Sequence, residues 1–194
     1  MIRLQISMND FARDMPLLLF VVSIFLSIIT WDPALMVLVI LVLVNVLIVC
    51  FLKGWIKQDR PRDEAGQITS MCGSVCNQMG IGVSSAPSSS DRWGMPSSHT
   101  QVVFSFFAFA IFLIVWRILP NMPSNSFKHK AMIFFTIPVF VLSPCLVAYQ
   151  RIHSRCHSLA QVVVGAILGI ATALIAAWLT TRIAKGGSKT CGVI

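Results

Sequence analysis

Residues 34–52 read ALMVLVILVLVNVLIVCFL, and this stretch decides the fold class. All nineteen residues are apolar except Asn45. At about 1.5 Å per residue, a helix of this length crosses a hydrocarbon core of roughly 30 Å. The stretch therefore predicts a transmembrane helix, and the rest of the chain has to be interpreted as part of a membrane protein.

Four more apolar stretches accompany this one. They cover residues 16–31, 98–119, 131–149 and 159–181. The first is short, but the residues before it lack the purely basic character of a cleaved signal, so we expect it to be retained. The pattern predicts an all-α, polytopic membrane helix bundle with about five transmembrane helices, and four or six helices are alternatives.

The composition agrees with this fold class. Hydrophobic residues make up 56% of the chain and charged residues only 11%, whereas soluble domains carry about a quarter charged residues. We expect a single membrane-embedded domain over residues 1–194, with a long loop at 53–97 and a short basic tail at 182–194. The net charge of +8 comes from loop residues without interleaved aromatics, so we expect no nucleic-acid partner.

The six cysteines do not form a metal-binding pattern. Cys72 and Cys76 lack the second ligand pair that a zinc site needs. They can form a disulfide with each other if their loop faces an oxidising lumen. Cys50, Cys145 and Cys156 lie in or beside apolar spans, where a free thiol usually serves as a small packing residue.

Counting spans places three polar clusters on one membrane face. The second span ends where residues 53–62 emerge. The third span begins on that same face, directly after residues 95–99, and the fourth span returns to it before residues 151–157. We therefore expect these three clusters to meet on one side of the membrane.

The clusters combine cations, hydroxyls and histidines with few carboxylates. Arginine forks, lysine charges and the free N–H groups of a helix start all bind phosphate oxygens. Ser98 and Ser158 each begin a span and precede a Gln by three residues, which is the spacing of a capping box. Without a carboxylate cluster to hold Mg²⁺, fixed cations and two histidines favour a metal-free phosphohistidine route that needs no cofactor.

The clusters resemble the signature of the type 2 phosphatidic acid phosphatase (PAP2) superfamily, which is Lys-x6-Arg-Pro, Pro-Ser-Gly-His and Ser-Arg-x5-His-x3-Asp. The matching positions are Lys53, Arg60, Pro61, Pro96, Ser97, His99, Arg151 and His157. Ser98 replaces the Gly of the second motif, and Gln150 and Gln161 replace the Ser and the Asp of the third. The resemblance covers residues 34–181 and implies the PAP2/haloperoxidase-like helical core.

This resemblance also implies roles for the site residues. His157 attacks phosphorus, His99 protonates the leaving phosphate, and Gln161 accepts a hydrogen bond from the ring of His157 and fixes its tautomer. The implied phosphate-binding residues are Lys53, Arg60, Ser97, Ser98 and Arg151. We expect the other nearby cations, Lys57, Arg62, Arg92 and Arg155, to be charges that flank the membrane.

The departures from the motifs are similar to those of dolichyldiphosphatases. That group has Ser and Gln at the positions of Ser98 and Gln161 and a Tyr before the third motif, as Tyr149 is here. The resemblance implies hydrolysis of a dolichyl (polyprenyl) diphosphate to the monophosphate, which recycles the lipid carrier of protein N-glycosylation. Another lipid phosphatase, a glucose-6-phosphatase-like enzyme and an inactive membrane scaffold are the alternatives.

The orientation in the membrane is not determined by charge. Lys and Arg number nine on the site face and six on the other, and six remain on each once Lys53, Arg60 and Arg151 are set aside. The family analogy and the C-a-a-X form of residues 191–194 favour an endoplasmic-reticulum membrane protein with a lumenal site. We also predict that the long, Ser-rich loop gates a lateral opening to the bilayer.

Overall fold

The structure, a computed structural model, describes residues 8–62, 72–78 and 92–190. Five of its helical stretches are long and apolar enough to cross a membrane: Arg13–Thr30, Pro33–Ile56, Ser98–Asn121, Phe127–His153 and Leu159–Ala184. The prediction of an all-α, polytopic membrane bundle with about five transmembrane helices is confirmed. Residues 63–71 and 79–91 of the loop that we predict to gate a lateral opening, and the C-a-a-X motif at 191–194, lie outside the described residues.

The chain runs through the following elements: α1 (Met8–Thr30), α2 (Pro33–Ile56), α3 (Val75–Gln78), α5 (Ser98–Leu113), the π-helical turn η1 (Ile114–Ile118), the short 3₁₀ turn η2 (Leu119–Asn121), α6 (Phe127–Ala131), the π-helical turn η3 (Met132–Thr136), α7 (Ile137–His153) and α8 (Leu159–Thr190). Within the described part of the chain, an isolated bridge between Asp59 and Trp93 is the only β-type pairing. Helices extend beyond the apolar stretches because hydropathy reports membrane burial and not where the backbone hydrogen bonds end.

The ends of α2 follow from local sequence. Asp32 caps the start, since its side chain accepts a hydrogen bond from the Ala34 amide at 2.9 Å, and Pro33 occupies the first turn. At the other end, Lys57 adopts a left-handed conformation and its N–H donates to the carbonyl of Lys53 at 3.1 Å. Lys53 was expected at the start of a loop and lies instead in the last turn of the helix.

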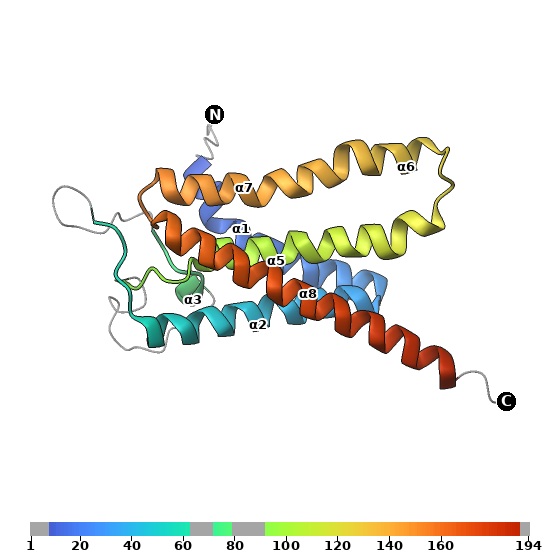
Figure 1. The fold of residues 1–194 in the computed structure, drawn as a ribbon, viewed down its shortest axis with the longest axis horizontal. Coiled ribbons are helices and arrows are strands. Elements are labelled where there is room, and N and C mark those ends of the chain that lie inside the picture. Colours follow the sequence, from blue (N-terminus) through green and yellow to red (C-terminus); the bar gives the residue numbers. More distant parts are fainter. Residues whose placement is uncertain (1–7, 63–71, 79–91, 191–194) are drawn as a thin grey trace.

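Helix α5 is the centre of the bundle. Figure 1 shows it between α7 on one side and α2 and α8 on the other, with α1 crossing behind it, and it makes contacts with all four. Its closest neighbour is α8, because Gly165 and Gly169 lie directly against its backbone. A Cβ atom at Gly165 would be only 2.7 Å from the carbonyl oxygen of Ser97. Small residues thus allow two transmembrane helices to pack backbone to backbone.

Further along α8, towards its C-terminus, small residues pack into the apolar core. Ala173 and Ala177 of α8 are buried against Phe109 and Leu113 of α5, and Leu38 of α2 belongs to the same cluster. Nearer the start of α5, the side-chain oxygen of Asn45 accepts hydrogen bonds from Gln101 of α5 and Thr172 of α8. A polar group at this depth requires such internal partners because lipid supplies none.

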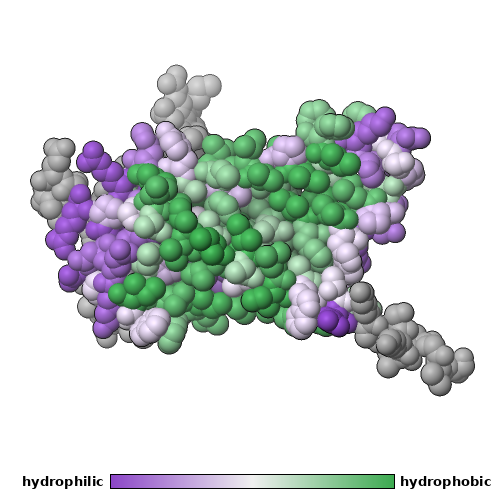
Figure 2. Space-filling model, viewed as in Figure 1, coloured by the Kyte–Doolittle hydropathy of each residue, from purple (hydrophilic) through white to green (hydrophobic). Residues whose placement is uncertain are grey.

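The outer surface is apolar over the middle of the bundle. Figure 2 shows one face of the bundle, with a hydrophobic belt between hydrophilic ends. Large apolar side chains that are exposed include Phe25, Leu47, Leu142 and Ile167. An exposed apolar surface of this extent requires a lipid environment. The protein is therefore a multi-pass membrane protein.

Candidate active site

The predicted phosphate-site residues all lie at one end of the bundle, where α2 and α7 finish and α5 and α8 begin (Figure 1). Each is buried, with at most 2% of its surface exposed; they are Lys53, Arg60, Ser97, Ser98, His99, Arg151, His157 and Gln161. His157 interacts electrostatically with Arg60, Lys53 and Arg151, and His99 interacts with His157. The three sequence clusters form one buried group, which we call the phosphate-site cluster.

Hydrogen bonds determine the tautomer of His157. Its Nδ1 lies 3.2 Å from Oε1 of Gln161. The Nε2 group of Gln161 donates to the carbonyl of Asp59 at 3.0 Å and to Oε1 of Gln58 at 3.3 Å, so the oxygen of the Gln161 amide faces the ring. An amide oxygen can only accept, and Nδ1 of His157 therefore carries the proton while Nε2 keeps a lone pair.

The Nε2 atom of His157 is suited to act as a nucleophile. It is buried and has no hydrogen-bond partner among the described residues. The pKa of His157 lies well below its ordinary value, because burial disfavours the imidazolium and the charges of Arg60, Lys53 and Arg151 repel it. A neutral ring with an available lone pair is the form that attacks an electrophile.

His99 presents the opposite ring nitrogen. Its Nε2 lies 3.0 Å from the carbonyl oxygen of Arg13 on α1, so this nitrogen carries a proton. Its Nδ1 is buried and has no hydrogen-bond partner among the residues described. When the ring is charged, Nδ1 gains a proton that it can donate, as a general acid requires.

The contribution of Arg13 was missed by sequence reasoning. Its main-chain carbonyl accepts from His99 and also from the side chain of Gln78 at 3.3 Å. A backbone carbonyl has no side-chain signature, so neither spacing nor residue type could have indicated this contact. The first helix therefore contributes to the site although none of the sequence motifs lies on it.

Arg151 and Ser98 offer further hydrogen-bond donors. Arg151 is fully buried in the last turn of α7, and its Nη2 donates to the carbonyl of Gly73 at 3.5 Å. Its Nε and Nη1 atoms and the hydroxyl of Ser98 have no partner within the described residues. An unpartnered buried charge is costly, so these donors indicate a site that is completed by an anion. A guanidinium fork and a hydroxyl suit the oxygens of a phosphate group.

Carbonyl groups of neighbouring segments hold the other two cations. The Nζ of Lys53 donates to the carbonyl of Trp93 at 2.8 Å. Nη1 of Arg60 donates to the carbonyl of Cys72. These contacts tie the end of α2 and the chain after it to segments that are distant in sequence.

The predicted capping box at Ser98 is wrong. Ser97 and not Ser98 precedes the first residue of α5, and its hydroxyl pairs with that of Thr100 at 2.9 Å. Gln101 does not reach back to the helix start. It donates instead to the side-chain oxygen of Asn45 on α2 at 3.1 Å, because the start of α5 is packed between helices and not exposed to solvent.

The predicted capping box at Ser158 is confirmed. The amide of Ser158 donates to Oε1 of Gln161 at 3.2 Å, and the amide of Gln161 donates back to the Ser158 hydroxyl at 3.4 Å. Gln161 thus caps α8 and orients His157 with the same oxygen. Gly94 packs against this amide so closely that a Cβ atom there would lie 2.5 Å from Oε1.

The predicted pairing of Cys72 with Cys76 is wrong, and so is the prediction that Cys50 and Cys156 are free thiols. Cys50 bonds to Cys76, and Cys72 bonds to Cys156. Residues 72–78 lie across the end of the bundle, which brings the paired Cα atoms to 5.9 and 5.2 Å. Cys145 is a free cysteine, and it is exposed on the outer surface rather than packed in the core.

The disulfides attach residues 72–78 to the phosphate-site cluster. Cys156 directly precedes His157, and Cys72 provides the carbonyl that accepts from Arg60. The adjacent Gly73 carbonyl accepts from Arg151. A segment that sequence reasoning assigned to a loop lid therefore forms a wall of the site.

Other polar residues near the site lie outside this cluster. Arg92 pairs with Asp59 at 2.9 Å on the surface, as expected of a flanking charge. His153 is exposed and stacks on Tyr149, with 5.6 Å between the ring centroids. In the described part of the chain, His, Cys, Asp and Glu side chains do not gather in groups of three that could hold a metal ion.

Comparison with protein families adds to this geometry. The family model described as PAP2 superfamily matches residues 34–185. The matched stretch contains every residue of the phosphate-site cluster and omits α1. No curated protein and no solved structure matched the chain.

Proposed function

The chain belongs to the PAP2 superfamily, and on this basis we propose that it hydrolyses a polyprenyl diphosphate of the dolichyl type to the monophosphate. Superfamily membership implies phosphatase activity on lipid phosphates, and the five spans set that activity in a bilayer. The observation that carries the proposal is the neutral His157, which Gln161 orients among buried cations. This hydrolysis recycles the lipid carrier of protein N-glycosylation.

In the first step, Nε2 of His157 attacks the terminal phosphorus atom. The new P–N bond forms as the P–O bond to the lipid monophosphate breaks, and Nδ1 of a protonated His99 donates its proton to the leaving oxygen. The Nδ1–H of His157 stays bonded to Gln161, which stabilises the positive charge that develops on the ring.

In the second step, water attacks the phosphohistidine. Nδ1 of His99, now without its proton, accepts one from the water as the new P–O bond forms and the P–N bond breaks. Inorganic phosphate leaves and both histidines regain their starting forms. Lys53, Arg60 and Arg151, together with Ser97 and Ser98, are the proposed ligands of the phosphate oxygens in both steps.

Phosphate release by the purified protein tests this function. The substrates are dolichyl diphosphate, dolichyl phosphate, phosphatidic acid and glucose 6-phosphate, each supplied in the same detergent. We expect the diphosphate to have the highest kcat/KM. Equal rates on all four would refute the diphosphate preference, and absence of any release would indicate the inactive scaffold.

Trapping the intermediate tests the route. Brief incubation with a diphosphate labelled at its terminal phosphate should leave an acid-labile, alkali-stable label on the protein. The label should be lost in His157→Ala and kept in His153→Ala, which changes an exposed histidine close by in sequence. A label that survives His157→Ala would assign the nucleophile to another residue.

We further propose that the protein resides in the endoplasmic-reticulum membrane with its site facing the lumen. The two disulfides at the site end support this orientation, because disulfides form and persist in oxidising compartments. Gly82→Asn completes an Asn-x-Ser acceptor with Ser84 in the long loop. This acceptor should be glycosylated in microsomes, whereas an acceptor appended after Ile194 should not be, since three spans lie between the loop and the C-terminus.

A further inference from the structure

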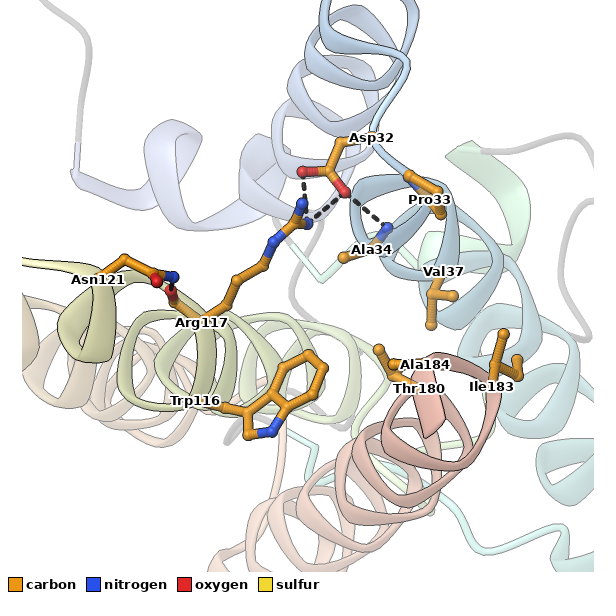
Figure 3. Close-up of a pocket in the computed structure, with 10 residues that line it drawn as sticks. All are labelled: Asp32, Pro33, Ala34, Val37, Trp116, Arg117, Asn121, Thr180, Ile183 and Ala184. Carbon is orange, nitrogen blue, oxygen red and sulfur yellow. Dashed lines mark hydrogen bonds and ion pairs between the residues drawn. The ribbon is translucent and has the colours of Figure 1, made fainter. Parts of the chain in front are cut away.

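A pocket of about 480 Å³ lies at the end of the bundle opposite the phosphate-site cluster (Figure 3). The start of α2, the end of the third span and the end of α8 surround it. Its lining residues are Asp32, Pro33, Ala34, Val37, Trp116, Arg117, Asn121, Thr180, Ile183 and Ala184. In Figure 3, Arg117 extends across to Asp32, and α8 forms the facing wall. None of these residues belongs to the phosphatase machinery, and we call this cavity the far pocket.

A second cavity continues the far pocket into the membrane. It has a volume of about 310 Å³, lies between α2 and α8, and shares Val37 and Ile183 with the far pocket. Thr172 is the only polar residue of its lining. Along α2 it extends from Val37 to Ile48, which is about 16 Å of helix at 1.5 Å per residue. A polar mouth joined to a long apolar groove has the shape of a lipid headgroup and its hydrocarbon chain.

Tryptophans mark the depth of the far pocket in the bilayer. Trp31, Trp116 and Trp178 lie at this end of the bundle with 76%, 38% and 57% of their surfaces exposed. Exposed tryptophans gather at the level of lipid headgroups. The mouth of the far pocket is therefore at headgroup depth, and the groove that continues from it is in the hydrocarbon region.

Charge at the far pocket favours an anion. Nη1 of Arg117 donates to both carboxylate oxygens of Asp32, at 2.5 and 2.6 Å. Its Nε and Nη2 groups donate to none of the described residues, and about half of the side chain is exposed. Asp32 is the only acidic residue on the described part of this face, which also carries Arg182, Lys128 and Lys130. The unused donors of Arg117 can bind a phosphate without breaking the ion pair.

We propose that the far pocket binds an anionic glycerophospholipid from the leaflet opposite the phosphatase site. Its phosphate contacts Arg117, its glycerol region lies beside Trp116, and one acyl chain follows the groove between α2 and α8. This lipid is distinct from the substrate, because its headgroup is a whole membrane thickness away from His157. If the phosphatase site faces the lumen, the lipid comes from the cytosolic leaflet, which is rich in anionic headgroups.

Quenching of tryptophan fluorescence by brominated lipids tests the proposal in the full-length protein. Bromine quenches a tryptophan that it contacts, and the difference between the wild type and Trp116→Phe isolates the signal of Trp116. Brominated phosphatidylserine should quench this signal at about one tenth of the mole fraction that brominated diacylglycerol needs, because diacylglycerol lacks the phosphate that Arg117 binds and a charge-assisted hydrogen bond is worth about tenfold or more in affinity. Equal quenching by the two lipids would overturn the proposal.

Two variants separate the headgroup contact from the groove. Arg117→Ala should abolish the preference for phosphatidylserine, whereas Arg182→Ala should retain it, because Arg182 lies on the same face but over Trp178 and outside the far pocket. Ile183→Phe should weaken quenching by both lipids, since the larger side chain blocks the junction of pocket and groove without adding a tryptophan. An equal loss in Arg182→Ala and Arg117→Ala would show only a diffuse surface charge and would refute the site.

Free phosphate distinguishes a lipid site from a general anion site. Inorganic phosphate at millimolar concentration should leave the quenching by phosphatidylserine unchanged, because it lacks the chain that occupies the groove. Displacement of the lipid by phosphate alone would show that the groove contributes nothing and would contradict the proposal. None of these measurements uses phosphatase activity, so they do not depend on the proposed function.

Discussion

Each end of the bundle holds an arginine, and the two arginines differ in burial and in their counterions. Arg117 pairs with the carboxylate of Asp32, and half of its side chain is exposed. Arg151 is fully buried and donates to a backbone carbonyl, while its Nε and Nη1 have no partner in the described part of the chain.

This difference distinguishes a charge that an ion pair neutralises within the fold from a buried charge whose donors are available to a ligand. A partly exposed arginine needs little compensation and its surface ion pair contributes little to stability. A buried guanidinium without an anion is unfavourable, and the fold retains it here beside two histidines, each of which has one ring nitrogen without a partner among the described residues. Among the described residues, the site end therefore leaves donors of Arg151 open to an anion, whereas the opposite end contains Asp32 as a counterion.

The largest expected effect is loss of the nucleophile. His157→Ala should lower kcat/KM for the diphosphate by at least about 1,000-fold, because removal of a nucleophile from a covalent route eliminates the reaction path. Phosphate release in detergent measures it. His153→Ala, four residues earlier at the exposed end of α7, should stay within about twofold. Comparable losses in both variants would indicate damage to the connection between α7 and α8 and not loss of a nucleophile.

The comparison of the two arginines is tested directly by matched substitutions. Arg151→Gln should lower kcat/KM by about 100-fold, since one lost donor to a developing charge in a buried site commonly costs that much. Arg117→Gln should change kcat/KM less than about twofold. Vanadate inhibition should weaken only in Arg151→Gln. If both variants lose activity equally, the two ends are not functionally distinct.

Reduction of the disulfides should have an intermediate effect. The carbonyls of Cys72 and Gly73 hold Arg60 and Arg151, so release of residues 72–78 should lower kcat/KM by about tenfold and weaken vanadate inhibition. Treatment of the folded protein with a reductant, followed by reoxidation, measures it. Cys145→Ser is the control, because Cys145 is free and its loss should alter neither activity nor sensitivity to reductant. Full activity with all thiols titratable would contradict the prediction.

The smallest expected effect concerns pH. The lowered pKa of His157 keeps Nε2 unprotonated at pH values where an ordinary histidine is charged, so the acidic limb of kcat/KM should lie below about pH 6.5. Gln161→Glu sets a carboxylate against Nδ1, which stabilises the imidazolium and should move this limb upward by about one unit. Gln58→Glu should move the acidic limb less, because Gln58 contacts Gln161 and not the ring of His157. An unchanged limb in Gln161→Glu would mean that His157 does not control it.

Much of the site could be predicted from the sequence, because the number of spans between two loops decides whether those loops lie on the same membrane face. Once the five apolar stretches are recognised, the polar residues that follow or precede them can lie only on one face or the other. Lys53, His99 and His157 therefore had to share a side, and the motif spacing then selected the same residues that the structure buries together.

The disulfide pairing and the hydrogen-bond partners were decided by tertiary structure alone. Cys72 and Cys156 are 84 residues apart, and their proximity depends on how residues 72–78 lie across the bundle. The bond from His99 to the Arg13 carbonyl depends equally on where α1 packs.

The amino-acid sequence by itself determined the membrane fold and the chemical groups of the site. Hydropathy and the number of spans between polar segments depend only on the order of residues along the chain. Only the tertiary structure decided which nitrogen of His157 holds the lone pair and which arginine has no counterion in the described part of the chain. Those depend on distances of a few ångströms between segments far apart in sequence, and no local pattern encodes them.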